Sequence, residues 1–431
     1  MNVLLVGSGG REHALAWGLA ASENCKTLYC APGNAGIESC AECVDIAFDD
    51  TPALVNFAKD KAIDLVVVGP EGPLVEGLAD ALKAEGIEVF GPDQKAAQLE
   101  GSKGFMKDLC AKYKIPTAAY GRFSDLESAT DFINKQPGNV VVKADGLAAG
   151  KGVIICESKE EAIEAAKDML SGTSFGDAGA EVVIEEFMDG EELSYFALAD
   201  GKTILPLTSA QDHKRVFDGD EGPNTGGMGA YSPAHLMNPE LEEKIIHQII
   251  EPTVKAMAAE GCPFTGVLYA GLMVVHGEPK LIEYNVRFGD PECQPMMMRL
   301  QGDLLSILHA GAQGRLSDIR GQVSWSKKTA LCVVMAAKGY PGSYEKNTEI
   351  KNLDLTMEVK DVTVFHAGTV KGENGAFLSV GGRVLGVTAL GDGIAEAQRR
   401  AYMAVNKIDW PEGFHRKDIG WRAIEAAEDA A

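Results

Sequence analysis

The stretch of sequence that decides the fold runs from Val140 to Val153 and reads VVVKADGLAAGKGV. Its opening valines predict a short buried strand, and Lys143 follows where that strand would leave the core. The residues after Lys143 are nearly all small, so the backbone can approach a ligand closely and the loop can close over it. Backbone N–H groups together with Lys143 and Lys151 suit phosphates, although an ordinary glycine-rich hairpin turn has the same composition.

This glycine-rich loop is not a Walker A sequence. Only Leu147, Ala148 and Ala149 separate Gly146 from Gly150, and Lys151 is followed by Gly152 rather than by Ser or Thr. A nucleotide site in this loop therefore belongs to another architecture.

The composition excludes several classes of protein. A chain of 431 residues has room for roughly two to four domains, and its net charge of -23 argues against a nucleic-acid surface, which needs basic residues. The start, MNVLLVGSGGREH, lacks the features of a signal sequence, and no segment approaches a membrane span. Nine cysteines without framework spacing favour the reducing cytoplasm. Cys40 and Cys43 form a CxxC with no second pair, so we expect packing or surface thiols there rather than zinc ligands.

Residues 1–100 alternate apolar strand candidates with helices, which predicts a doubly wound parallel sheet. The first turn, Gly7-Ser8-Gly9-Gly10-Arg11-Glu12, invites a dinucleotide interpretation that the bulk and charge of Glu12 oppose. A helix N-terminus with Arg11 still suits one phosphate monoester, and a purely structural turn is the alternative. Gly- and Pro-rich turns at 31–36 and 69–74 would follow other strands at the same sheet edge. We also expect one helix from Val75 to Glu85.

Two further segments carry candidate nucleotide contacts. Lys103 falls in the first turn of a predicted helix, where a bound anion would explain a cation that the helix dipole disfavours; a solvated lysine is the alternative. The run VVIEEFMDGEE, 182–192, predicts a strand with an acidic exit, and Glu185, Glu186 and Glu192 are too many carboxylates for core residues. Backbone beside Phe187 and Met188 could bind adenine and Glu192 could accept from ribose hydroxyls, unless the turn is merely solvated.

The polar run Asp212-His213-Lys214-Arg215 leads into a predicted long loop, 218–232, of the kind that forms lids or binding sites. His213 alone would more often be a surface histidine, but its charged neighbours favour a substrate contact. Further along, strand alternation puts Glu283, Asn285 and Arg287 on one face. A carboxylate, an amide and a guanidinium together suit a magnesium-bound triphosphate.

From about Trp325 the pattern indicates a smaller β-rich unit, in which the sequence shows no chemistry of its own. We expect strands at 329–336, 362–366 and 383–389 and a helix at 394–407.

This arrangement of motifs resembles the ATP-grasp superfamily and, more closely, the glycinamide ribonucleotide synthetase family. The segments that carry the resemblance extend over nearly the whole chain. They are LVGSGGREHALAW, APGNAG, VVGPEGPLVEGL, GPDQKAAQLEGSK, VVKADGLAAGKGV, VVIEEFMDGEE, SAQDHKRVFDGDEGPNTGGMGAYSP, IEYNVRFGDPE and GGRVLGVTALG.

The resemblance implies ATP-dependent ligation of glycine to 5-phosphoribosylamine through a glycyl phosphate, giving glycinamide ribonucleotide, ADP and phosphate in de novo purine biosynthesis. It implies an α/β fold with an N-terminal doubly wound parallel sheet, a central ATP-grasp α+β domain with a mobile lid and a small β-rich C-terminal domain. The expected domains are 1–100, 101–324 with a lid over about 117–188, and 325–431. ATP is the expected co-substrate and Mg2+ or Mn2+ the metal, in a cytoplasmic monomer without nucleic-acid or membrane partners.

By the same resemblance, each candidate residue takes a role. ATP would be held by Lys103, Lys143, Gly146, Gly150, Lys151, Gly152, Glu185, Glu186, Phe187, Met188 and Glu192. Acceptor or glycine contacts would come from Gly9, Gly10, Arg11, His213, Lys214 and Gly289, the metal would be held by Glu283 and Asn285, and catalytic roles would fall to Arg287, Lys143, Asp212 and Asp290.

One departure from the wider superfamily concerns the metal. The strand before Glu283, from Gly266 to Met273, lacks the additional acid that many members carry, so a second metal has no obvious protein ligand. Alternative functions are another carboxylate–amine ligase or a nucleotide-sensing protein without turnover. The pair of Glu283 and Asn285 argues against a sensor, and Glu12 argues against a nicotinamide oxidoreductase.

Overall fold

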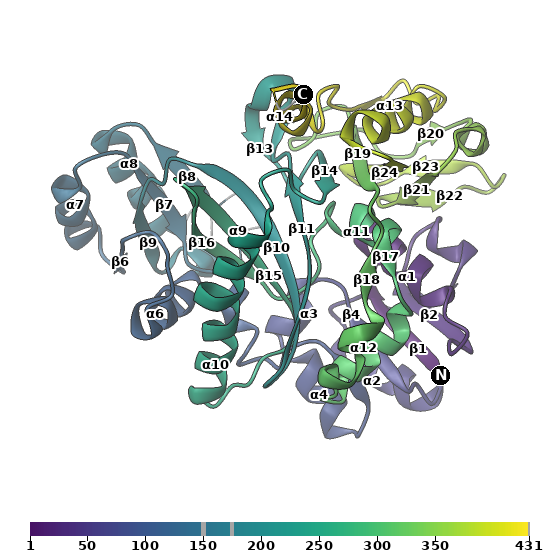
Figure 1. Ribbon diagram of the computed structural model, residues 1–431, viewed down its shortest axis with the longest axis horizontal. Coiled ribbons are helices and arrows are strands. Elements are labelled where there is room, and N and C mark those ends of the chain that lie inside the picture. Colours follow the sequence, from purple (N-terminus) through teal and green to yellow (C-terminus); the bar gives the residue numbers. More distant parts are fainter. Residues whose placement is uncertain (148–151, 173–175, 430–431) are drawn as a thin grey trace.

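The computed structural model describes residues 1–147, 152–172 and 176–429. It begins with a five-stranded parallel sheet, shown in purple and violet in Figure 1, whose strand order is β3-β2-β1-β4-β5. Along β1, Val3 and Leu5 pack in the core that includes α1, whereas Leu4 and Val6 pack in the core that includes α2 and α4. Helices therefore cover both faces, and the predicted doubly wound parallel sheet is confirmed. The elements are β1 (Asn2–Gly7), α1 (Gly10–Ala20), β2 (Thr27–Pro32), β3 (Glu42–Cys43), α2 (Thr51–Asp60), β4 (Leu65–Val68), α3 (Glu71–Val75), α4 (Leu78–Ala84) and β5 (Glu88–Phe90).

The prediction of one helix from Val75 to Glu85 is wrong. The segment contains two helices, α3 and α4, which are separated at Gly77. Gly77 has a φ of 93°, in a region that favours glycine, and this conformation cannot continue a right-handed helix.

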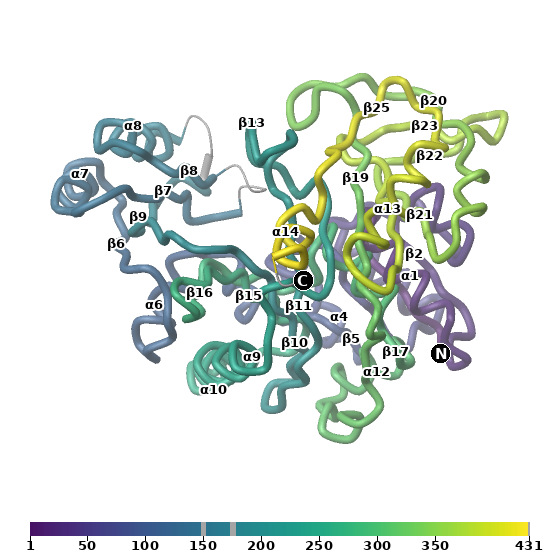
Figure 2. The backbone as a smooth tube through the Cα atoms, turned by 45° about the horizontal axis from the view of Figure 1, so that its top comes forward, coloured from purple at the N-terminus to yellow at the C-terminus, as the bar shows by residue number. Residues whose placement is uncertain are grey.

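A four-stranded antiparallel sheet, β6-β9-β7-β8, forms a separate lid unit at one end of the molecule (Figures 1 and 2). Its small core packs Ala129 and Ile133 of α7 and Ala162 and Ala166 of α8 against the sheet. The predicted strand at Val140 is confirmed as β7, and the predicted strand at Val182 is β9, which ends at the first acidic residues of the run, Glu185 and Glu186. The elements are β6 (Tyr120–Phe123), α7 (Leu126–Lys135), β7 (Val140–Ala144), β8 (Val153–Cys156), α8 (Lys159–Leu170) and β9 (Val182–Glu186).

The largest sheet has nine strands and runs through the middle of the chain in the order β16-β15-β10-β11-β14-β19-β24-β21, with β25 beside β19. Helix α6 (Lys103–Tyr113) follows α5 (Gln98–Gly101). Further along the chain, α9 (Pro239–Ile245), a π-helical turn at Ile246–Ile250 and α10 (Glu251–Ala259) follow one another directly. The strands before the C-terminal unit are β10 (Glu191–Asp200), β11 (Ile204–Asp212), β14 (Gly229–Ser232), β15 (Thr265–Val275) and β16 (Glu278–Asn285).

The predicted long loop at 218–232 contains regular structure. Strands β12 (Arg215–Phe217) and β13 (Glu221–Asn224) form a small hairpin around a 3-10 turn at Asp218–Asp220, and β14 follows. Strand β14 then pairs with β19, with Gly229 opposite Val333, so the large sheet continues into the unit that begins near Trp325.

The C-terminal unit contains the three predicted strands and the predicted helix. They are β19 (Thr329–Ala337), β21 (Val362–His366), β24 (Arg383–Gly391) and α13 (Ile394–Val405). A three-stranded sheet of β20 (Thr348–Ile350), β22 (Thr369–Lys371) and β23 (Phe377–Ser379) flanks them, and β25 (Gly413–Phe414) and α14 (Trp421–Asp429) close the chain. Helices α11 (Cys293–Arg299) and α12 (Leu304–Ala312) and the short strands β17 (Leu300–Gln301) and β18 (Ser324–Trp325) precede the unit. Within the described residues, no helix is long and apolar enough to cross a membrane.

Candidate nucleotide and acceptor sites

Glu185 lies between two buried lysines. Its Oε1 is 2.9 Å from Nζ of Lys143 on β7, and its Oε2 is 2.9 Å from Nζ of Lys107 on α6. Glu185 is 2% exposed, so the expectation that it is not a core residue is wrong, because two ammonium groups compensate its charge. Sequence reasoning missed Lys107, although it lies four residues after Lys103 and hence on the same helix face. The three charges sum to one positive charge where the lid sheet meets α6.

Lys103 begins α6 and contacts the glycine-rich loop. Its Nζ donates to the carbonyl of Gly146 at 3.1 Å, and its backbone N–H donates to the carbonyl of Asp145. The Asp145 carboxylate accepts from Ser102 Oγ at 3.0 Å and from the Gly104 N–H at 2.5 Å. Burial lowers the pKa of Lys103, and the carboxylate of Glu283 opposes that effect. A partly desolvated cation is therefore fixed beside the loop that follows β7.

The loop itself is described up to Leu147 and again from Gly152. The Gly146 N–H donates to the carbonyl of Ala178, and a Cβ at Gly146 would lie 2.8 Å from the Cβ of Ala178, so the close approach needs glycine. The carbonyl of Gly152 accepts from the N–H of Ala144. The predicted phosphate contacts Gly150 and Lys151 lie outside the described residues.

The exit of β9 leaves little free backbone for adenine. The N–H groups of Glu186 and Phe187 donate to the carbonyls of Ala119 and Asn139, at 2.9 and 3.2 Å. Glu186, Phe187 and Met188 were the three predicted adenine contacts. Of their main-chain N–H groups, that of Met188 has no partner in the described part of the chain. The Phe187 side chain is exposed.

Asp212, Lys214 and Glu192 form a second charged group at the ends of β10 and β11. Lys214 Nζ is 2.7 Å from Oε2 of Glu192. Burial raises the pKa of Asp212 to about 7, with Lys214 opposing and Glu292 reinforcing the shift. Coulombic interactions connect this group to Lys143, which acts on Glu192, and to Glu283, which acts on Lys214. The structure thus brings together the predicted phosphate, ribose and metal residues.

Glu283 and Asn285 occupy alternate positions of β16, opposite Gly271 and Tyr269 of β15, as the strand pattern predicts. Neither side chain has a hydrogen bond or ion pair among the described residues, although both are only partly exposed. Two oxygen donors that face one way without protein partners fit a hard divalent cation. Among the described residues, no three His, Cys, Asp or Glu side chains cluster in a way suited to a metal.

Arg287 lies just beyond β16 and is bonded to two carboxylates. Its Nε is 3.0 Å from Glu71 Oε2, and its second terminal nitrogen is 3.0 Å from Glu100 Oε1. Burial alone would raise the pKa of Glu71, but the positive charges of Arg287 and Arg11 outweigh this effect and lower the pKa to about 2. Sequence reasoning missed both carboxylates, since neither is near Arg287 in the chain.

A cavity of about 320 Å³ lies where loops after β1 and β2 meet Asp290 and the C-terminal unit. Ser8, Gly9, Gly33 and Asn34 line it from the N-terminal sheet. The opposite side of the cavity is lined by residues of the C-terminal unit, in which the sequence showed no chemistry of its own: Ala367, Gly368, Thr369, Val370, Val380 and Arg383. The C-terminal unit therefore contributes a cation to this cavity.

Glu12 explains why the first turn is not a dinucleotide site. Its Oε2 accepts from the Gly9 N–H at 2.6 Å, and a Cβ at Gly7 or Gly69 would collide with its side chain. A protein carboxylate thus occupies the helix N-terminus. The Arg11 guanidinium binds Glu12 Oε1 at 2.6 Å and the carbonyl of Phe288, and Arg11 is absent from the cavity lining.

Asp290, which lines this cavity, is hydrogen-bonded to three other residues. It accepts from the Arg11 N–H at 3.4 Å and from Gln294 at 2.9 Å, while its backbone carbonyl accepts from Arg383 at 2.6 Å. Gly10 and Gly289 lie close by, packed so tightly that a Cβ would meet Gln294 and Glu292 respectively.

His213 is 1% exposed, and its Nε2 accepts from the backbone N–H of Gly420 at 2.9 Å. The structure therefore directs this ring toward the C-terminal segment, and a substrate contact for it stays a prediction.

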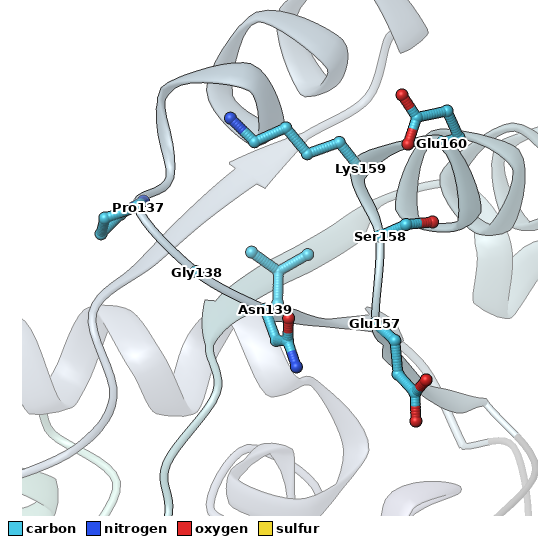
Figure 3. A pocket seen from close by; sticks show the side chains of 8 residues that line it. Pro137, Gly138, Asn139, Glu157, Ser158, Lys159 and Glu160 are labelled. Atoms are coloured by element: carbon cyan, nitrogen blue, oxygen red, sulfur yellow. The ribbon is translucent and has the colours of Figure 1, made fainter.

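Figure 3 shows another hollow, of about 270 Å³, on the lid. It lies between the segment before β7, from Pro137 to Val140, and the start of α8, from Glu157 to Glu160. None of the predicted nucleotide residues lines it, and Lys143 lies toward the opposite end of β7. We assign it no role.

Solved structures at low sequence identity show the same fold. The biotin carboxylase domain of Hydrogenobacter thermophilus 2-oxoglutarate carboxylase has a TM-score of 0.73 at 16% identity, over 96% of this chain and 91% of that one. Because residues 101–293 also match a family model of an ATP-grasp domain, the fold defines an ATP-grasp protein.

Sequence comparison identifies the family within that class. Residues 1–100, 101–293 and 330–422 match the N, ATP-grasp (A) and C domains of phosphoribosylglycinamide synthetase. Phosphoribosylamine–glycine ligase of Brucella melitensis is 58% identical over 99% of both chains. The chloroplastic Arabidopsis thaliana ligase is 56% identical over 97% of this chain and 80% of its own. The crystal structure of the Thermotoga maritima ligase has a TM-score of 0.83 at 34% identity, covering 97% of this chain and all of that one. The chain belongs to the phosphoribosylglycinamide synthetase family.

Proposed function

We propose that this chain uses ATP to join glycine to 5-phosphoribosylamine, forming glycinamide ribonucleotide, ADP and phosphate. The observation that carries the proposal is one charged site, built from Lys103, Lys143, Glu192 and Glu283, in a chain of this family. The carboxylate of glycine is a poor electrophile. Transfer of the γ-phosphoryl group to one of its oxygens makes glycyl phosphate, whose carbonyl the acceptor amine attacks while phosphate leaves with that oxygen. The amine loses a proton in this step.

The nucleotide is proposed to lie between the lid and the large sheet. Lys103 and Lys143 neutralise phosphate charge, Met188 offers its N–H to adenine, and Glu192 accepts from ribose hydroxyls. Lys143, which is paired with Glu185, would extend to the phosphates, while Lys107 would remain paired with Glu185. Arg287 steadies the transferring phosphoryl group, held in place by Glu71 and Glu100.

Glu283 and Asn285 are proposed to hold the Mg2+ or Mn2+ that accompanies ATP. Their lack of partners among the described residues supports this assignment. When bound, the metal would neutralise the charge of the phosphate oxygens and orient them.

Phosphoribosylamine is proposed to occupy the cavity between the N-terminal sheet and the C-terminal unit. Its phosphate would lie near the loop at Gly9 with Arg383 beside it, while Gly10 and Arg11 would support that loop from outside the cavity lining. Asp290 lines this cavity, and Gly289 precedes Asp290 in the chain, two residues after Arg287. Asp212 is a candidate to accept the proton of the attacking amine, because a pKa of about 7 suits proton transfer at neutral pH.

We further propose three domains, at 1–100, 101–324 and 325–431, with a lid at about 117–188, in a cytoplasmic monomer. Nine free cysteines support a reducing compartment. Sedimentation or size-exclusion analysis would test the monomer.

The reaction is tested by measuring ADP release with ATP, Mg2+, glycine and phosphoribosylamine generated in situ, omitting each component in turn. We expect ADP formation to need all of them. ADP formation that does not depend on glycine or phosphoribosylamine would overturn the proposed substrates.

A further inference from the structure

The C-terminal segment holds both neighbours of Lys214 in place. The backbone N–H of Gly420 donates to Nε2 of His213 at 2.9 Å. On the other side of Lys214, the carbonyl of Arg215 accepts from the guanidinium of Arg416 at 3.0 Å. The carbonyl of Lys214 itself accepts from the N–H and the hydroxyl of Thr225, both at 2.8 Å. The backbone around Lys214, which lies between β11 and β12, is thus fixed by contacts from other segments of the chain.

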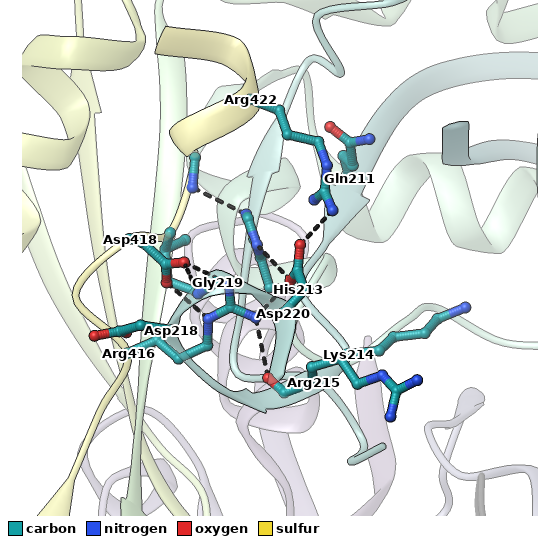
Figure 4. A network of polar contacts seen from close by, with 12 residues as sticks. Gln211, His213, Lys214, Arg215, Asp218, Gly219, Asp220, Arg416, Asp418 and Arg422 are labelled. Carbon is teal, nitrogen blue, oxygen red and sulfur yellow. Dashed lines mark hydrogen bonds and ion pairs between the residues drawn. The ribbon is translucent and has the colours of Figure 1, made fainter. Parts of the chain in front are cut away.

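Arg416 is the centre of this contact and is 1% exposed (Figure 4). Its guanidinium donates to Asp220 Oδ1 at 2.8 Å and to both oxygens of Asp418, at 2.8 and 2.7 Å. Asp220 also pairs with Arg422 at the start of α14. The guanidinium groups of Arg416 and Arg422 therefore bind the carboxylate of Asp220, which lies about 200 residues earlier in the chain, and Arg416 also binds Asp418 of its own segment.

Two backbone contacts complete the junction. The Gly219 N–H donates to Asp418 Oδ2 at 2.8 Å, and the Lys417 N–H donates to Asp218 Oδ1 at 2.7 Å. The turn at 218–220 and the segment at 416–422 thus bind each other through side chains and backbone, which gives the hairpin of β12 and β13 one defined position.

Lys214 connects this junction to the nucleotide residues. Its ammonium group is 2.7 Å from Glu192, the carboxylate proposed for the ribose hydroxyls. A lysine side chain is flexible, and its ion pair with a half-exposed carboxylate is weak unless its backbone is fixed. The position of Glu192 therefore depends on how firmly the backbone at Lys214 is held.

We infer that Arg416, with Asp220 and Arg422, is a positioning element for ATP binding: it fixes the backbone at Lys214 so that Lys214 orients Glu192. This inference rests on the proposed role of Glu192. The C-terminal segment then acts at the nucleotide site without touching the nucleotide.

The test uses Asp220→Asn in the full chain, because Asp220 is partly exposed and Arg416 keeps Asp418 as a partner after the change. We expect the KM for ATP to rise about tenfold, as a loss of about 1.4 kcal/mol in binding requires, with little change in the KM for phosphoribosylamine. Arg422→Gln, which removes the other partner of Asp220, should shift the KM for ATP in the same direction.

A double-mutant cycle separates positioning from general damage. In a Lys214→Met background, Asp220→Asn should add almost nothing to the rise in KM for ATP, because the contact through which it acts is already gone. Equal effects with and without Lys214 would overturn the inference.

Arg400→Gln is the matched control. Arg400 is another largely buried arginine of the C-terminal unit, paired with Asp361 at 3.0 Å and Glu396 at 2.7 Å, away from the junction. It should lower thermal stability without raising the KM for ATP, and an equal rise in that KM would contradict the inference. Glu192→Gln identifies the origin of a failure: if it leaves the KM for ATP unchanged, the proposed role of Glu192 fails. If Glu192→Gln raises that KM and Asp220→Asn does not, only the positioning inference fails.

Discussion

Replacing Glu185 by Gln removes the charge that compensates two buried ammonium groups. Lys107 and Lys143 each lie 2.9 Å from this carboxylate, and their side chains are 0% and 5% exposed. Loss of one partner of a buried ion pair costs about 3–5 kcal/mol, because the remaining charge is left buried without compensation. Glu185 joins β9 to both β7 and α6, so this cost falls on the lid and on its junction with α6.

Hydrogen exchange measured by mass spectrometry reports this local cost. For the peptides that contain β7 and β9, a loss of about 3–5 kcal/mol lowers the protection factor by about 10²- to 10⁴-fold, at about 1.4 kcal/mol for each factor of ten. Glu181→Gln is the matched control, because Glu181 lies just before the same strand and pairs with Arg122 at the surface, where an ion pair contributes about 0–1 kcal/mol. If Glu185→Gln costs the lid no more protection than Glu181→Gln, the account of the buried lysine pair is refuted.

Three further predictions concern catalysis. Glu283→Gln should lower turnover by orders of magnitude while leaving the dissociation constant of metal-free ATP nearly unchanged, and near-normal turnover would remove Glu283 from the metal site. Arg383→Gln should raise the KM for phosphoribosylamine more than Arg11→Ala does, because Arg383 lines the cavity and Arg11 is already paired with Glu12; steady-state kinetics with both variants decide between them. The pKa of Asp212 is raised to about 7, so the carboxylate form that accepts a proton increases as pH rises through 7. The rising limb of kcat between about pH 6 and 8 should therefore disappear in Asp212→Asn, and an unchanged pH profile would exclude Asp212 as the base.

The same Asp212 shift has a consequence for stability. A carboxyl group whose pKa is higher in the folded than in the unfolded chain stabilises the fold below its unfolded pKa. That contribution is lost as pH rises toward 7, so activity and stability respond to this group in opposite directions.

Local patterns in the sequence were enough to predict the elements that surround the nucleotide. The strand at Val140, the small residues after Lys143 and the alternation of Glu283 with Asn285 are each set within a few residues by burial and strand geometry. The parallel N-terminal sheet followed from the same kind of pattern.

Contacts between distant segments could not be predicted in this way. Arg383 reaches the cavity proposed for phosphoribosylamine, and Arg416 reaches Asp220, only because β14 pairs with β19 and brings the C-terminal unit beside the central sheet. The burial of Glu185 depends on Lys107 in another element, and the pairing of Arg11 with Glu12 depends on side-chain geometry at the turn. Spacing places Lys107 on the helix face of Lys103, but it does not show that Glu185 packs against that face.

The central claim is that the γ-phosphoryl group of ATP passes to the carboxylate of glycine before the amine attacks. Glycine labelled with 18O in both carboxylate oxygens tests this step directly, with the released phosphate analysed by mass spectrometry. The account predicts one 18O atom in each phosphate released. Phosphate without label would contradict the glycyl phosphate step and require that the oxygen leaving with phosphate come from another source.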